Sequence, residues 1–151
     1  MDCGRNESLS GTGEHMTYDT KIAIIIRKDL LNWQQVNVTA FLAGGLAGFY
    51  PEVVGEAYKD ASGQAYTPLL RQPVFVYGVE AAEMTRTHQR AASRDVRMAI
   101  YTEPLFKTNN DHDNREAVLS STTDKLNLVG IGIYANSKNV DKIINGLKFL
   151  S

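Results

Sequence analysis

Cysteine is nearly absent: the 151 residues include only Cys3, close to the start of the chain. A disulfide within the chain and a zinc site built from several cysteines are therefore excluded. Neither sign of charge is in excess, because the formal net charge is −1, and the chain lacks the basic surplus that favours nucleic acid. This composition fits a reducing compartment, so we expect a cytoplasmic protein with no nucleic-acid partner.

Long hydrophobic runs are also missing. The longest nearly apolar stretch covers residues 38–50, which is shorter than the ~20 residues that a membrane-spanning helix needs. The first 20 residues carry charges of both signs and no apolar run, unlike a signal peptide. We therefore expect no membrane partner, a disordered leader over residues 1–20, and a single α/β domain over residues 21–151.

The first predicted element of the domain is a strand over residues 21–28, an isoleucine-rich run between charged ends. Both of its faces are apolar, which is typical of an interior strand that is covered on two sides. A helix follows and continues to about Tyr50, because Pro51 stops it. Asn32 is its predicted N-cap, and Gln35 completes a capping box three residues later.

The apolar residues of this helix form two stripes at helical spacing, which predicts burial on more than one side. The first stripe, which we expect to pack on the sheet, consists of Val36, Ala40, Ala43 and Ala47. The second stripe, in which two glycines allow another backbone to come close, consists of Asn37, Phe41, Gly44 and Gly48.

The rest of the chain alternates between strands and helices. Further strands are predicted over residues 73–79, 96–102 and 126–134. Further helices are predicted over residues 80–94 and 115–121, and from Ser137 onward. Residues 52–70 are less regular, with two short strands predicted around a turn at residues 60–63.

The order of these elements determines the predicted fold. Strands that alternate with helices predict a three-layer α/β/α sandwich on a four-stranded mixed, mostly parallel sheet. In the last strand, Gly130 and Gly132 lie on the same face, where a neighbouring element can pack closely. The sequence contains no internal repeat and no domain linker.

Catalytic and cofactor motifs are missing as well. The sequence has no phosphate-binding loop, dinucleotide fingerprint, nucleophile elbow or zinc-metalloprotease pattern. The cluster most similar to a metal site is Asp111-His112-Asp113 with Glu116. Acidic residues before a helix favour its dipole without any ion, and adjacent residues cannot all converge on one metal. We therefore expect neither a metal nor a cofactor.

Polar residues interrupt the first helix near its start, where Gln34 and Asn37 lie. This helix start follows the carboxyl end of the first strand, and Tyr101 and Thr102 end the third strand. Ligands of open α/β sheets collect at such ends, and free N–H groups at a helix start favour an anionic or carbonyl group. Plain helix capping explains these residues equally well. The candidate ligand-binding residues are Gln34, Asn37, Tyr101, Thr102, Thr108, Asn114 and Arg115.

Short motifs at both ends of the domain resemble type II peptidyl-tRNA hydrolases. The first motif is IIIRKDL at residues 24–30, followed by a helix rich in alanine and glycine. The second motif is LVGIGI at residues 128–133, followed by an amphipathic helix. The resemblance covers most of residues 21–150, and it implies a three-layer sandwich on a four-stranded mixed sheet in proteins that are commonly dimeric.

The sequence departs from these hydrolases at the residues that carry their chemistry. No lysine or arginine occurs from Asp29 to Tyr58, whereas the resemblance implies a functional lysine and a histidine in this part of the chain. The Asp-Ala-Gly-x-Thr-Gln motif of the hydrolases is replaced by TEPLFKT at residues 102–108. A stretch without basic residues is a poor surface for a polyphosphate, so we expect no peptidyl-tRNA hydrolase activity.

A more specific resemblance is to an uncharacterised family of small bacterial proteins with the same fold. The shared pattern consists of DLxxWQxxNVxAFL at residues 29–42, IYT at 100–102, FxT at 106–108 and NR at 114–115. This resemblance implies membership of that family, and it implies no known activity.

The sequence thus supports one leading hypothesis and two alternatives. The leading hypothesis is a small-ligand-binding or regulatory domain that lacks the hydrolase residues and takes a small polar or anionic ligand. The first alternative is an enzyme of hydrolytic or transfer type that uses Glu103 or Asp111 as its base. The second alternative is a structural homodimer that buries Phe41 and Gly48.

Overall fold

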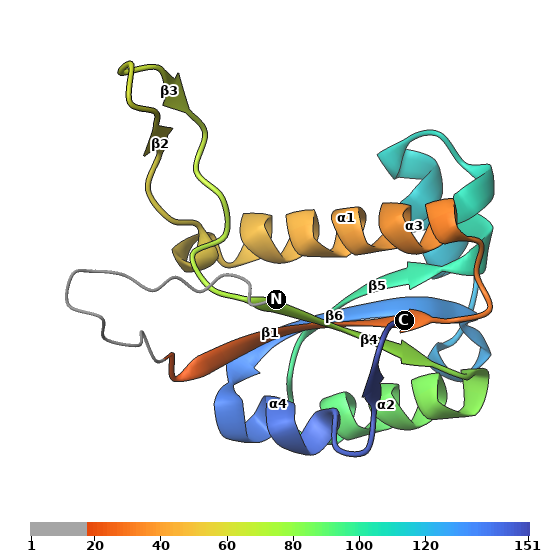
Figure 1. Cartoon of the computed structure of the whole chain (residues 1–151). Helices are drawn as coiled ribbons and strands as arrows, with labels where there is room; N and C mark the ends of the chain where they lie inside the picture. The colour runs from red at the N-terminus through yellow and green to blue at the C-terminus, as the bar shows by residue number, and fades with distance from the viewer. Residues whose placement is uncertain (1–17) are drawn as a thin grey trace.

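The computed structural model describes residues 18–151 and forms a mixed α/β unit around a central sheet (Figure 1). The main elements are β1 (Thr20–Arg27), α1 (Asn32–Phe49), β4 (Val74–Val79), α2 (Ala81–Ser93), β5 (Met98–Thr102), β6 (Leu128–Asn136), α4 (Ser137–Ile143) and β7 (Lys148–Phe149). The smaller elements are the 3-10 turns η1 (Pro51–Val53), η2 (Glu103–Lys107) and η3 (Thr123–Lys125), the strands β2 (Tyr58–Lys59) and β3 (Ala65–Tyr66), and helix α3 (Asp111–Leu119). Most of the predicted leader, residues 1–17, lies outside the described residues.

The central sheet has five strands in the order β5-β6-β1-β4-β7, so the predicted number of four is wrong. The additional strand, β7, is only two residues long and pairs with β4. The predicted dominance of parallel pairs is also wrong, because only β1 and β4 pair in parallel. Strand β6 lies between β5 and β1 and runs antiparallel to both. The sequence did not predict this, because the residue pattern of a strand does not reveal the direction of its neighbour.

Helix α1 covers one face of the sheet, while α2 and α4 cover the other (Figure 1). Strand β1 is central and contributes to both faces. Its Ile22, Ile24 and Ile26 are buried in the core on the α1 side, and Ala23 and Ile25 are buried in the core on the opposite side. The prediction of an interior strand with two apolar faces is therefore confirmed.

Helix α1 packs on the sheet through Val38, Leu42 and Leu46, which are all buried. The predicted stripe is wrong: Val36, its first member, is 70% exposed. The reason lies in β6, which has no side chain at Gly130 under the helix. A Cβ at Gly130 would lie 2.5 Å from Val38 Cγ1 and 2.9 Å from Leu42 Cδ1. Large side chains of α1 occupy this groove, and the small alanines of the predicted stripe would not fill it.

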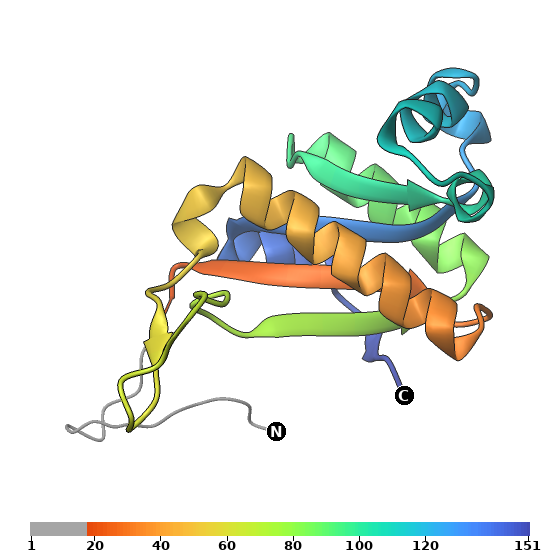
Figure 2. The same ribbon diagram turned by 90° about the horizontal axis from the view of Figure 1, so that it is seen from above.

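The segment after α1 forms a two-stranded hairpin that protrudes from the rest of the molecule (Figures 1 and 2). We call residues 55–71 the β2–β3 arm. Its base is held by the bridge between Val54 and Leu70 and by the hydrogen bond from the Gly55 amide to the Leu69 carbonyl, 2.8 Å. The two short strands predicted around a turn at residues 60–63 are confirmed.

Within residues 18–151, no helix has the length and apolar character needed to cross a membrane.

The close approach of α1 to β6 generates a stability prediction. We expect Gly130→Ala to lower the free energy of unfolding by about 1–3 kcal/mol, because the new Cβ overlaps Val38 and Leu42 in a packed core. The measurement is chemical denaturation followed by circular dichroism.

Gly45→Ala is the matched control, since a Cβ there would meet only Ala99 Cβ, at 3.9 Å. Alanine in place of glycine inside a helix is expected to stabilise by roughly 0.5–1 kcal/mol. Equal effects of the two substitutions would contradict the packing described for β6.

Candidate functional site

Three residues of α1, spaced four apart, face the edge of the sheet formed by β5 and η2. The rings of Trp33 and Phe106 meet edge to face with centroids 6.0 Å apart, and those of Phe41 and Tyr101 do so at 5.8 Å. Between them, Asn37 Nδ2 donates a hydrogen bond to the Tyr101 hydroxyl, 3.3 Å. We call these five residues the aromatic seam.

The seam extends from the core to the surface. Tyr101 is only 5% exposed, and its ring also contacts Phe106, with the centroids 5.1 Å apart. Trp33 is 59% exposed and Phe41 is 57% exposed. Burial raises the pKa of the Tyr101 phenol, and the hydrogen bond from Asn37 opposes this in part. The phenol therefore stays neutral at physiological pH and can both donate and accept a hydrogen bond.

Thr102 follows Tyr101 and is only 2% exposed. The pairing of β5 with β6 shifts register between these two residues, which marks a bulge at the end of the strand. Within residues 18–151, the Thr102 hydroxyl has no hydrogen-bond partner. A buried hydroxyl without a hydrogen-bond partner lowers the stability of the fold. The end of β5 therefore contains a polar side chain whose hydrogen bond is not made within the described residues.

The remaining candidate residues form hydrogen bonds or ion pairs at or near the first turns of α1 and α3. Gln34 Oε1 accepts a hydrogen bond from the Leu31 amide, 2.9 Å, which makes Leu31 and not Asn32 the N-cap of α1. The predicted N-cap is therefore one residue too late. Gln35 instead donates from Nε2 to the carbonyl of Lys28 at 3.4 Å and to that of Leu30 at 3.3 Å. Both glutamines thus fix the loop between β1 and α1.

Thr108, Asn114 and Arg115 lie at the start of α3, which begins at Asp111, earlier than the predicted start at residue 115. The Thr108 hydroxyl donates to Asn114 Oδ1, and Arg115 forms an ion pair with Asp111. The structure thus joins Asn37 to Tyr101 and, separately, Thr108 to Asn114. Within residues 18–151, no three His, Cys, Asp or Glu side chains form a group that could hold a metal ion.

Trp33, Phe41 and Phe106 were not among the predicted site residues. The spacing of Trp33, Asn37 and Phe41 is visible in the sequence as one row of a helix. Which neighbour this row faces depends on how the helix rotates over the sheet. The spacing of these three residues and the shared family pattern could therefore have indicated that they act together. Neither could have shown that Trp33 contacts Phe106.

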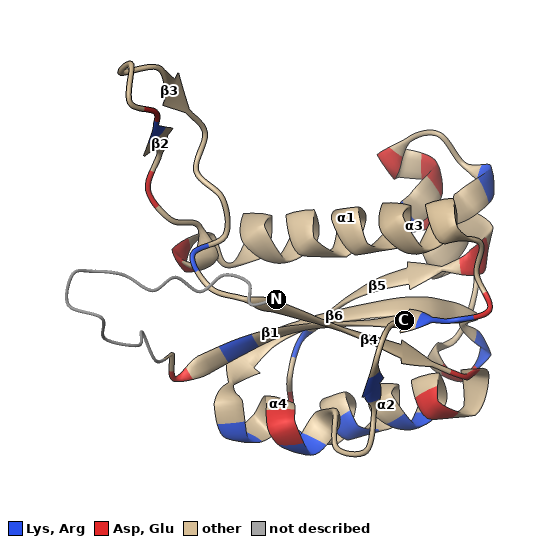
Figure 3. Cartoon of the chain, viewed as in Figure 1, with Lys and Arg blue, Asp and Glu red and all other residues tan. Residues whose placement is uncertain are grey.

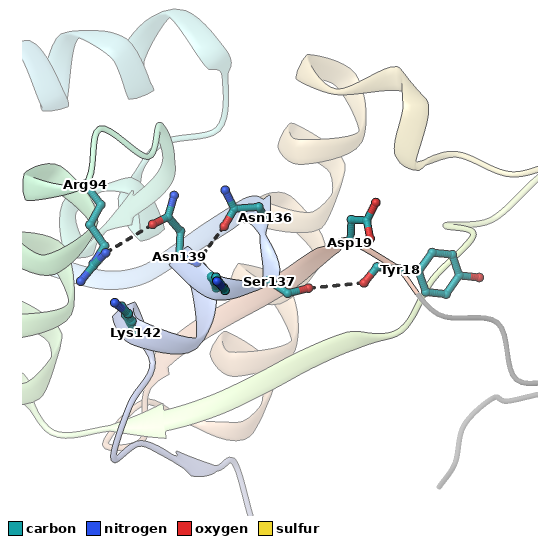
Figure 4. A pocket seen from close by; sticks show the side chains of 8 residues that line it. Tyr18, Asp19, Arg94, Asn136, Ser137, Asn139 and Lys142 are labelled. Atoms are coloured by element: carbon teal, nitrogen blue, oxygen red, sulfur yellow. Dashed lines mark hydrogen bonds between the residues drawn. The ribbon is translucent and has the colours of Figure 1, made fainter.

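A polar hollow of about 520 Å³ lies where the chain enters β1 and α4 begins (Figure 4). It is lined by Tyr18, Asp19, Arg94, Asn136, Ser137, Lys138, Asn139 and Lys142. None of the predicted site residues lines it. Several of its polar groups bond to each other: Arg94 Nη1 donates to Asn139 Oδ1 at 3.3 Å, and the Ser137 hydroxyl donates to the Tyr18 carbonyl at 3.4 Å. The hollow thus lies at a junction that connects the start of β1 to α4.

An ion pair fixes the carboxyl end of β1, just before α1. Arg27 donates to both carboxylate oxygens of Asp29, at 3.0 and 2.8 Å. Arg27 Nη1 also donates to the Leu128 carbonyl at 3.3 Å, which connects this end of β1 to β6. The Arg27 guanidinium holds the pKa of Asp29 below its ordinary value.

The sheet, the uncharged helix α1 and the aromatic seam define a small mixed α/β protein with a candidate binding face. Residues 20–151 match the family described as "Protein of unknown function (DUF2000)", and the chain belongs to this family. The prediction of a family without a known activity is therefore confirmed. The resemblance to type II peptidyl-tRNA hydrolases stays a prediction.

A solved structure supports the same assignment. It is that of a protein of unknown function from Agrobacterium tumefaciens strain C58, with 39% sequence identity and a TM-score of 0.86. The similarity covers 89% of this chain and 100% of that chain. No curated protein matches the chain.

The Arg27–Asp29 pair generates a prediction of pH dependence. A carboxyl whose pKa is lower in the folded state stabilises the fold above its unfolded pKa of about 3.9, and this contribution is lost as pH falls through the folded pKa. Because the Asp29 side chain is 59% exposed, we expect Asp29→Asn to cost at most about 1 kcal/mol at pH 7. Denaturation measured from pH 7 downward should show this cost begin to fall near pH 4 and disappear only below the folded pKa of Asp29.

Glu56→Gln provides the control, since Glu56 is an exposed carboxylate on the arm. Its effect on the free energy of unfolding should stay near zero at every pH. A cost of Asp29→Asn that persists undiminished at low pH would show that the ion pair is not its cause.

Proposed function

We propose that the protein is a small-ligand-binding or regulatory domain with the three-layer fold of type II peptidyl-tRNA hydrolases and without their chemistry. The observation that supports this proposal is the aromatic seam. Its two exposed rings, Trp33 and Phe41, flank the hydrogen-bonded pair of Asn37 and Tyr101. Ligand sites commonly combine apolar and aromatic walls with a few polar groups that orient the ligand.

The chemistry of the seam favours a neutral, planar, polar ligand. Aromatic rings provide flat apolar surface, and a carboxamide offers both a donor and an acceptor. Asn37 uses Nδ2 for Tyr101, which leaves its Oδ1 to accept from a ligand. Helix α1 carries no acidic or basic side chain (Figure 3), so of the two ligand classes expected from the sequence, a neutral polar molecule fits better than an anion.

The absence of basic residues on α1 also supports the loss of hydrolase chemistry. Binding of a nucleic-acid backbone depends on lysine and arginine side chains that neutralise phosphates. The alternative of an enzyme with Asp111 or Glu103 as its base has less support. Asp111 is exposed and paired with Arg115, and Glu103 lies outside the aromatic seam, at the start of η2.

Trp33 is the only tryptophan, so its fluorescence reports directly on the seam. We expect titration with neutral planar amides, represented by nicotinamide and uracil, to change the emission of Trp33 in a saturable way. Asn37→Ala should weaken the affinity by about tenfold, because one hydrogen bond of roughly 1–1.5 kcal/mol is lost.

Val36→Ala is the matched control, since Val36 lies on the same helix but outside the seam and should leave the affinity unchanged. Thr102→Ala tests the buried hydroxyl in the same titration. If these probes leave the emission unchanged, or if Asn37→Ala binds them as tightly as the wild type, the seam does not bind this class of ligand.

Peptidyl-tRNA hydrolysis requires a direct assay. We expect no release of free tRNA from peptidyl-tRNA above the rate in buffer, because α1 provides no cation for the phosphates. A type II peptidyl-tRNA hydrolase assayed in parallel shows that the substrate is intact. Turnover by the present protein above the buffer rate would contradict the proposed loss of chemistry.

A further inference from the structure

The polar hollow at the start of β1 concentrates positive charge in a chain whose formal net charge is −1. Its cations are Arg94, which follows α2, and Lys138 and Lys142 of α4 (Figure 4). The only acidic side chain in its lining is Asp19, so three cations against one carboxylate give a local charge of +2. Within residues 18–151, none of these cations forms an ion pair with a carboxylate. Like charges held together in this way favour a bound anion.

The two carboxamides of the hollow also offer donors. Asn136 Oδ1 accepts from the Asn139 amide at 2.8 Å, and Asn139 Oδ1 accepts from Arg94 Nη1 at 3.3 Å (Figure 4). A backbone N–H and a guanidinium only donate, so these two bonds determine which end of each carboxamide is the oxygen. Neither NH2 group has an acceptor in the part of the chain that the structure describes. Because Asn136 already caps α4, the donors that remain in the hollow belong to side chains.

Hydrogen bonds between distant segments hold the walls of the hollow together. The Ser137 amide donates to the Asp19 carbonyl at 2.7 Å, and the Ser137 hydroxyl donates to the Tyr18 carbonyl at 3.4 Å. Arg90 Nη1 donates to the Asn145 carbonyl at 2.9 Å, which holds α2 beside the segment that follows α4. The backbone that carries the donors is therefore fixed before a ligand arrives, and this lowers the cost of ordering the site on binding.

We propose that the polar hollow binds the phosphate group of a small phosphorylated molecule. A phosphate monoester carries a charge of about −1.5 to −2 at pH 7 and three strong acceptor oxygens, which match the local charge and the surplus of donors. The planar guanidinium of Arg94 suits two phosphate oxygens, and the lysines act as point charges. The volume of about 520 Å³ lies within the roughly 300–1,000 Å³ of small-molecule sites, so the hollow has room for more than the phosphate.

This site is separate from the aromatic seam. None of the residues that line the hollow belongs to the seam. Tyr101 of the seam pairs with Gly130 near the start of β6, whereas Asn136 of the hollow is the last residue of this strand. The two surfaces also differ in charge, because the seam is neutral and the hollow is positive. Binding at the hollow therefore neither requires nor excludes a ligand at the seam.

Isothermal titration calorimetry of the full chain in about 0.1 M salt tests the proposal, with inorganic phosphate and ribose phosphate as probes. We expect saturable binding of both, and tighter binding of ribose phosphate, because its sugar occupies the rest of the hollow. Lys142→Gln and Arg94→Gln should each weaken binding roughly tenfold or more, because each removes a charge-assisted hydrogen bond. Asp19→Asn should strengthen binding severalfold, because it removes the one carboxylate that repels the phosphate. Circular dichroism checks that the variants fold.

Lys125→Gln is the matched control, because it removes an exposed lysine that precedes β6, at the end of the strand opposite the hollow. The nine residues of β6 span roughly 30 Å, well beyond the Debye length of about 10 Å, so the affinity should not change. Absence of saturable binding at about 10 mM of either probe, or binding that survives Lys142→Gln and Arg94→Gln unchanged, would overturn the proposal. Ribose phosphate that binds no more tightly than inorganic phosphate would overturn the assignment to a phosphorylated molecule.

Discussion

The closeness of α1 to β6 is the constraint on which the rest of the structure depends. Gly130 and Gly132 leave space where side chains would otherwise stand, and Val38, Leu42 and Leu46 fill it. This contact fixes the rotation of α1 about its own axis. Every other position of the helix then has a determined direction, so that one row faces β5 and η2 while another faces outward.

The surroundings of the two exposed rows of α1 follow from that rotation. Trp33, Asn37 and Phe41 turn toward Tyr101 and Phe106, which creates the aromatic seam with its single amide–phenol hydrogen bond. Val36 and the small residues behind it turn outward, beside the β2–β3 arm. Because α1 bears no charge, the seam suits the neutral, planar ligand that we propose better than it suits an anion.

The family of this chain is established, whereas its activity is not. The family match and the solved structure establish which proteins this chain belongs with, and neither carries a known activity. The site must therefore be argued from its own chemistry. Local partners occupy Gln34, Thr108 and Arg115, which gives these residues structural roles. Asn37, Tyr101 and the rings around them are therefore the main candidates for the proposed binding.

The sequence by itself determined the order of strands and helices, the double-sided burial of β1, the close approach at Gly130 and Gly132, and the hairpin turn near Asp60. These features depend on the spacing of apolar residues, on the positions of glycines and on turn-forming residues. All three can be read from residues that are close together in the sequence. Only the tertiary structure decided the direction of β6, the fifth strand, the inward face of α1 and the pairing of Asn37 with Tyr101. A helix that has no charged residue, and whose polar residues all lie in its first half, has no continuous polar face to orient it. Its rotation was therefore set by the shape of the sheet beneath it.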